Sequence, residues 1–169
     1  MSDVLPWLEY KWSFDFPVGM YRAILERVRG TPARLEELLV DVPREELKAK
    51  PQGKWSILEQ AGHLWAVDGL HQTRLEQYLR GETNLVAADM SNRRTNEGNF
   101  NDMPREVVLG HFRDVRMKLM HTLDSLSLED AARSALHPRL QKQMRLVDMC
   151  FFIAEHDDHH IAVIRTLLA

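Results

Sequence analysis

Apolar residues recur at every third or fourth position near the C-terminus, and this spacing constrains the fold more than any other feature of the sequence. The stripe consists of Met149, Ile153, His156, His160, Ile164 and Leu167. Side chains at such intervals lie on one face of an α-helix. The sequence therefore predicts a C-terminal helix whose buried face carries two imidazoles.

The two histidines of this stripe need a polar partner. His156 and His160 are four residues apart, about one helical turn, and burying an imidazole without a partner costs free energy. A shared metal ion would satisfy both, because neutral imidazole is the commonest metal ligand. Hydrogen bonds in the core or at its rim are the alternative. The zinc-protease motif His-Glu-x-x-His is absent, since Asp157 follows His156.

A third ligand is expected from another helix, since a catalytic metal usually has three protein ligands and open positions. His63 is the best candidate, because it lies in the middle of a long predicted helix on an apolar stripe. A lone histidine on such a stripe is more often a packed core residue. The pair in the last helix is what favours a metal site.

Four stretches of the chain have the helical period. The first begins at Pro17, and Gly30-Thr31-Pro32 predicts a stop and a restart, with Thr31 as N-cap. Ser56 and Glu59 form a capping box that begins the second helix; Glu59 could also orient His63, but the capping interaction is preferred. The predicted helices cover residues 17–29 with a continuation to 40, 56–80, 104–126, and about 144 to near the C-terminus.

The segments between these helices lack helical or strand periodicity. Residues 1–16 are rich in aromatic side chains and are expected to form an irregular arm packed on the body. Residues 81–103 and 129–143 are long links, which permit crossover connections between helices. The chain is therefore predicted to be all-α, a four-helix bundle forming a single domain over residues 1–169.

Composition excludes several classes of partner. The 22 basic and 25 acidic residues give a net charge of -3, which argues against direct binding of nucleic acid. No apolar stretch approaches the roughly 20 residues that span a bilayer, and no signal peptide is recognisable. Cys150 is the only cysteine and is predicted to be a small buried hydrophobe, which fits a cytoplasmic protein.

Two segments resemble the DinB superfamily. They are Trp55-Ser56-Ile57-Leu58-Glu59-Gln60-Ala61-Gly62-His63-Leu64 and Phe152-Ile153-Ala154-Glu155-His156-Asp157-Asp158-His159-His160, and the similarity extends from the first helix to the last, including His137-Pro138-Arg139-Leu140. The resemblance implies a four-helix bundle in up-down-down-up arrangement, often a homodimer. It also implies a divalent metal, typically nickel or zinc, held by His63, His156 and His160.

The resemblance specifies the reaction less closely than it specifies the metal site. The superfamily includes YfiT-like metal-dependent hydrolases and bacterial thiol S-transferases, so the resemblance implies a small-molecule substrate. Either a low-molecular-weight thiol is activated for S-transfer to an electrophile, or metal-bound hydroxide hydrolyses the substrate. A metal- or thiol-binding stress-response protein without turnover is the third alternative, and the sequence leaves open whether the chain is an enzyme.

The link 81–103 is predicted to form a wall for substrate or cofactor recognition. Its polar candidates are Arg93, Arg94, Asn96 and Asn99, of which an arginine could pair with a carboxylate of a thiol cofactor. A solvated connection or a dimer contact is the alternative for this link.

Several further residues receive only a general interpretation. His159 could compete as a ligand but is expected to pack at the flank of the stripe, while His71 and His121 are expected to be partly exposed. His111 and His137 remain unassigned. The tryptophans are predicted to be core or interface residues: Trp7, Trp12, Trp55 and Trp65.

Overall fold

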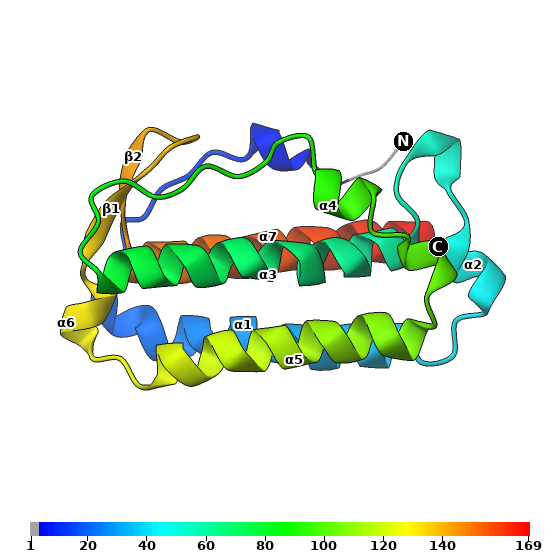
Figure 1. Ribbon diagram of the computed structural model, residues 1–169, viewed down its shortest axis with the longest axis horizontal. Helices are drawn as coiled ribbons and strands as arrows, with labels where there is room; N and C mark the ends of the chain where they lie inside the picture. The colour runs from blue at the N-terminus through cyan, green and yellow to red at the C-terminus, as the bar shows by residue number, and fades with distance from the viewer. Residues whose placement is uncertain (1–3) are drawn as a thin grey trace.

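Four long helices form the body of the protein in a computed structural model that describes residues 4–169 (Figure 1). They are α1 (Tyr21–Leu39), α3 (Ile57–Leu79), α5 (Arg105–Asp124) and α7 (Leu146–Leu167). Helices α1 and α7 run in one direction and α3 and α5 in the other, so the predicted up-down-down-up bundle is confirmed. Each helix contacts one parallel and one antiparallel neighbour: α1 packs on α7 and α5, and α3 packs on α5 and α7.

Short elements connect and cover the bundle. The antiparallel strands β1 (Ser134–His137) and β2 (Lys142–Arg145) were missed by the sequence analysis, which expected no regular structure in the link 129–143. Four residues per strand are too few for an alternating pattern to stand out. The remaining elements are α2 (Arg44–Lys48), α4 (Arg93–Asn96), α6 (Leu128–Ala131), and the 3-10 turns η1 (Trp7–Glu9), η2 (Val18–Met20), η3 (Pro51–Gly53) and η4 (Phe100–Asp102).

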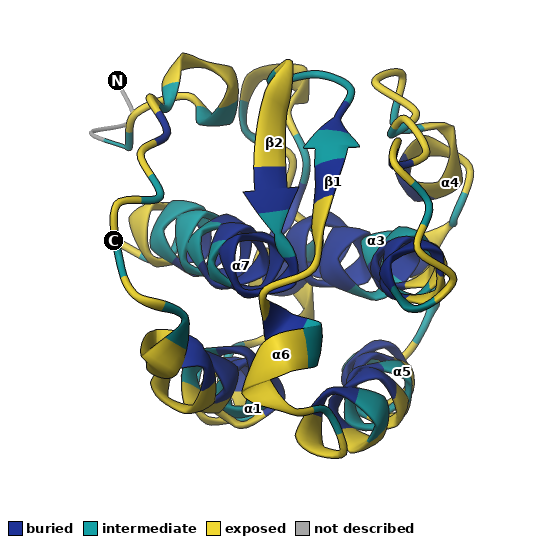
Figure 2. Ribbon diagram, turned by 90° about the vertical axis from the view of Figure 1, so that its left-hand side faces the viewer, coloured by how far each residue is buried: buried dark blue, intermediate teal, exposed yellow. Residues whose placement is uncertain are grey.

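Helices α3 and α7 form the inner layer of the molecule. Figure 2 shows α1 and α5 beneath them and the β hairpin above them, and Figure 1 places the N-terminal arm and the segment 81–103 on that same upper side. The arm is held in place by β2, because Lys142 donates to Trp12 O (2.6 Å) and Arg145 donates to Phe16 O (2.9 Å). The expectation of an irregular packed arm is therefore confirmed for its described part.

Helix α1 is continuous, so the predicted stop at Gly30-Thr31-Pro32 is wrong. Pro32 lies inside the helix and has no N–H to donate to Val28 O, the carbonyl one turn earlier. Arg116 of α5 replaces that donor, with its Nη1 2.9 Å from Val28 O. Thr31 is buried and contacts Asp157 rather than capping a new helix. A contact from another helix thus removes the break that local sequence rules predict.

Arg116 joins all four long helices at the centre of the bundle. Its guanidinium is fully buried, donates two hydrogen bonds of 2.9 Å to Asp68 of α3, and also pairs with Asp157 of α7. Thr31 of α1 donates to Asp157 at 2.6 Å. Buried charges are tolerated only when they are paired and hydrogen-bonded, as they are here.

Other predictions of local structure are confirmed or adjusted. Ser56 and Glu59 form the predicted capping box at the start of α3, and Cys150 is buried, with its pKa raised to about 12 by that burial. Met20 and Val107, apolar residues within the predicted helices 17–29 and 104–126, are exposed. Among the described residues, no helix combines the length and the apolar character needed to cross a membrane.

Replacing Arg116 by methionine should destabilise the protein strongly. Arg116→Met leaves the Asp68 and Asp157 carboxylates buried together without a counter-charge, so we expect the free energy of unfolding to fall by about 3–5 kcal/mol in urea titrations. The control is Arg29→Met, which removes a half-exposed pair with Asp124 and should cost less than about 1 kcal/mol. Equal losses of unfolding free energy in the two variants would show that the buried network stabilises the protein no more than an exposed ion pair does.

Candidate metal centre

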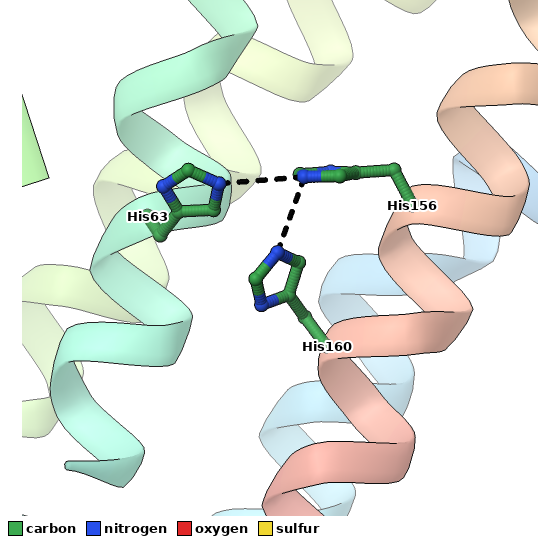
Figure 3. A group of neighbouring side chains, drawn as sticks. All are labelled: His63, His156 and His160. Carbon is green, nitrogen blue, oxygen red and sulfur yellow. Dashed lines mark hydrogen bonds between the residues drawn. The ribbon is translucent and has the colours of Figure 1, made fainter. Parts of the chain in front are cut away.

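Three buried imidazoles meet between α3 and α7. Nε2 of His156 lies 3.3 Å from Nε2 of His63 and 3.1 Å from Nε2 of His160 (Figure 3). The ligand atoms of the three residues lie within 4.8 Å of one another. The three histidines selected from the sequence are therefore brought together, with their Nε2 atoms facing one point.

Residues close to His63 in the sequence fix the position of its side chain. The capping box at Ser56 begins α3 two turns before it, and Gly62 immediately precedes it. A Cβ atom at Gly62 would overlap the ring of Phe100, so the absence of a side chain lets η4 and the segment before it approach α3 closely. That approach places Thr95 of α4 within 2.9 Å of Nδ1 of His63.

Hydrogen bonds on the far side of two rings orient them. Gln60 Oε1 accepts from Nδ1 of His160 at 2.6 Å, and Thr95 Oγ1 can accept from Nδ1 of His63. With the proton on Nδ1, each of these rings presents the lone pair of Nε2 to His156. Such contacts fix the tautomer that a metal ligand requires.

The protonation pattern fits a bound cation. A single proton on Nε2 of His156 could serve only one of the two facing lone pairs. A divalent cation would accept all three Nε2 lone pairs at once. The donor set, three neutral nitrogens from two rigid helices, is one that zinc and nickel accept.

Burial keeps these imidazoles neutral. It lowers the pKa of His63 to about 4, with a smaller contribution from His159, and lowers the pKa of His156 and His160 well below the usual value. Metal binding then requires no proton release from the ligands at neutral pH.

The three histidines lie in a cleft of about 840 Å³ on the upper side of α3 and α7. Trp7 and Trp55 flank them, with ring centroids 5.0 Å from His156 and 4.8 Å from His63 respectively. The segment 86–95 forms one wall and the turn of the β hairpin another. A ligand that reaches the histidines would therefore be enclosed largely by apolar and aromatic side chains.

The polar residues selected from the segment 81–103 have different surroundings. Arg94 lines the cleft beside Gly69, whereas Arg93 is exposed and pairs with Glu97 at 3.5 Å. Asn96 accepts from Trp55 Nε1 at 2.9 Å, so it supports a wall of the cleft. Asn99 is exposed in a left-handed turn.

Sequence reasoning missed several residues of the cleft. His71 was expected to be partly exposed, but it is buried and lines the cleft together with Arg74, His137 and Arg139. His71 and Arg74 lie one turn apart on α3, at helical spacing from His63, and this spacing was the available signal. His159 lines the cleft outside the group of three, with Nδ1 3.4 Å from Tyr10 Oη.

Comparisons with known proteins agree with this architecture. A family model described as the DinB superfamily matches residues 27–164. The chain is also similar to a solved structure described as "YfiT from Bacillus subtilis is a probable metal-dependent hydrolase with an unusual four-helix bundle topology". That similarity has a TM-score of 0.80 and 19% identity, and covers 94% of this chain and 91% of the other. No curated protein matches the sequence.

His137 should make the metal-free protein sensitive to acid. Burial, aided by the charges of Arg74 and Arg139, lowers its pKa from 6.5 to about 4. Between these values the unfolded chain binds a proton that the folded protein does not, so stability falls as the pH falls from 6.5 to 4. From pH 8 to pH 5 this group should account for a loss of about 2 kcal/mol.

Urea titrations of the metal-free protein at both pH values measure this effect. His137→Gln should show a pH-dependent loss that is smaller than the wild-type loss by that amount. His121→Gln, at an exposed position of α5, should behave like the wild type. The same pH dependence in His137→Gln and wild type would contradict the assignment.

Proposed function

This chain belongs to the DinB superfamily, and from that premise we propose that it is a divalent-metal-dependent enzyme that activates a low-molecular-weight thiol for transfer to an electrophile. The observation that carries the proposal is the convergence of three Nε2 atoms on one point at the base of a large cleft. His63, His156 and His160 would hold the ion, nickel or zinc by their chemistry. A divalent ion with three neutral ligands lowers the pKa of a coordinated thiol or water, so that a nucleophile forms near neutral pH.

The residues around the three histidines favour a thiol as the nucleophile. Hydrolysis of most substrates needs a general base beside the attacking water. Of the described residues that line the cleft, Asp89 is the single carboxylate, and its oxygens already accept from Ser91 and the backbone N–H of Arg93. The histidines of the cleft outside the group of three are His71, His137 and His159, and burial lowers the pKa of each, which makes them weak bases. A thiol gives up its proton more easily than water and needs no such base.

The walls of the cleft have their own roles. Trp7 and Trp55 flank the histidines and limit their contact with bulk water, which would strengthen electrostatic interactions at the reacting atoms. Gln60 and Thr95 keep the Nε2 lone pairs directed at the ion. The chain thus orients the nucleophile and shields it, while the segment 86–95 encloses the electrophile.

Hydrolysis is the second candidate function. It is supported by the description of the structurally similar YfiT as a probable metal-dependent hydrolase. In that reaction the same histidines would hold the ion, and a water molecule would take the place of the thiol.

The three histidines should account for the metal content. We expect about one equivalent of nickel or zinc per chain in the tag-free protein by elemental analysis, and almost none in His63→Ala/His156→Ala, because one remaining imidazole binds an ion weakly. His121→Ala, which removes an exposed histidine elsewhere, should retain the metal. Equal metal content in the double variant and the wild type would refute the site.

Thiol transfer should depend on the loaded metal. With 2-mercaptoethanol and 1-chloro-2,4-dinitrobenzene, the metal-loaded protein should form the thioether at least about 100-fold faster than His63→Ala/His156→Ala, since metal activation contributes several kcal/mol to the barrier. Product is measured by absorbance after subtraction of the uncatalysed rate.

A parallel assay with 4-nitrophenyl acetate in the absence of thiol tests the second candidate. Ester hydrolysis without thiol transfer would assign the hydrolase function. Saturable metal binding with neither product would assign a binding protein instead of an enzyme.

A further inference from the structure

The charged side chains that line the cleft are mostly cationic. Among the described residues they are Arg74, Arg94 and Arg139 against the single carboxylate of Asp89. Within the part of the chain that the structure describes, none of these three arginines forms an ion pair with a carboxylate: Arg74 contacts Val86 O and His137, and Arg139 packs over Phe152. In a protein with a net charge of -3, this local excess of positive charge requires a separate explanation.

Arg139 presents a free donor inside the cleft. Its Nη2 is buried and has no hydrogen-bond partner among the described residues, and its guanidinium packs over the ring of Phe152, 5.8 Å from the centroid. A buried guanidinium donor without an acceptor costs free energy, so the position is best explained by an acceptor that a ligand supplies.

His71 is a second unpaired group in the same cleft. It is 4% exposed, and both of its ring nitrogens are buried without a hydrogen-bond partner. Its ring lies 6.4 Å from that of His156, whose Nδ1 also lacks a partner. Polar atoms that are unpaired in the protein and line one cavity indicate a polar ligand.

Arg74 lies on the same helix as His71 and contacts the hairpin turn that carries Arg139. It lies one turn after His71 on α3, donates to Val86 O through Nε (3.0 Å), and places Nη1 3.2 Å from Nε2 of His137. Arg139 follows His137 by two residues in the hairpin turn. All the partners of Arg74 are neutral, so a full positive charge remains buried at this end of the cleft.

The arginines of this end are separated from the three histidines along the cleft. Arg74 follows His63 by eleven residues, which corresponds to about 16 Å along α3. His71 lies between them, with its ring 6.4 Å from that of His156. The ring of Phe152 and the ring of Trp7, 5.0 Å apart, lie between the two ends on the α7 side. The cleft thus has a metal-binding end and an arginine-lined end, with His71 between them on α3.

We propose that His71, Arg74 and Arg139 bind a carboxylate of the ligand whose other end reaches the three histidines. The free Nη2 of Arg139 and one N–H of His71 provide two donors, which match the two oxygens of a carboxylate, and Arg74 supplies additional charge. A phosphate monoester has three outer oxygens and would leave one of them without a donor. The identification of this ligand as the substrate rests on the proposed function, whereas the carboxylate site itself does not.

The test uses metal-free full-length protein at pH 7, so that the outcome is independent of the metal. Isothermal titration calorimetry compares 4-phenylbutyrate with the neutral 4-phenylbutanol and with 4-phenylbutyl phosphate. We expect the carboxylate to bind at least tenfold more tightly than the alcohol. Arg139→Met and His71→Phe should each raise its Kd about tenfold or more, because each removes a charge-assisted or buried hydrogen bond.

Two controls keep this result interpretable. Arg133→Met removes the same charge from an exposed arginine that pairs with Asp130 outside the cleft, and should leave the Kd unchanged. His121→Phe, which makes the same replacement as His71→Phe at an exposed position of α5, should also leave it unchanged. Equal affinity for carboxylate and alcohol, or an unchanged Kd in Arg139→Met, overturns the proposal. Tenfold tighter binding of the phosphate would overturn the choice of carboxylate.

A second measurement identifies which reactant carries the carboxylate. The cobalt-loaded protein is titrated with 6-mercaptohexanoate and with 6-mercaptohexanol while the sulfur-to-metal absorption band is recorded. Tighter binding of the acid, lost in Arg139→Met, places the carboxylate on the thiol. Equal binding of the two thiols, together with the calorimetric result above, places it on the electrophile.

Discussion

The guanidinium of Arg116 is the interaction on which the rest of the bundle depends. From α5 it reaches Asp68 of α3, Asp157 of α7 and the backbone of α1 at Val28. The geometry of a planar fork with five donors fixes the directions of these contacts, so it restricts how the helices are rotated about their axes. The donor that it supplies to Val28 O also lets α1 continue through Pro32.

This constraint positions the candidate metal centre on the opposite side of the inner layer. Asp157 faces the bundle interior, and its neighbour His156 therefore faces the cleft, because adjacent residues on a helix point about 100° apart. Asp68 of α3 likewise faces the bundle interior, where it pairs with Arg116, while His63 and His71 of the same helix line the cleft. The inner layer thus directs Asp68 and Asp157 toward Arg116 on one side, and directs the imidazoles and Arg74 toward the cleft on the other.

The enclosure of the site comes from segments without long helices. The N-terminal arm contributes Trp7, the segment 86–95 contributes Thr95 and Arg94, and the hairpin turn contributes Arg139. Each of these segments is held by specific contacts, such as those of Lys142 and Arg145 to the arm and of Arg74 to Val86. The three histidines therefore come from the helices, whereas much of the enclosure of the cleft comes from the segments that connect them.

The meeting of His63 with His156 and His160 joins two different helices, so it depends on the tertiary structure. The sequence pattern was enough to predict the four long helices and the shared face of His156 and His160, since residues three, four or seven positions apart on a helix share a face whatever the rest of the chain does. It also determined the capping box at Ser56, which depends only on residues within one turn. The tertiary structure alone decided that α1 runs through Pro32, that His71 is buried, and that Arg139 meets the cleft. Each of these depends on a contact between residues far apart in the chain. Local spacing does not indicate that Arg116 will donate to Val28 O, or that the hairpin and the segment 86–95 will cover α3.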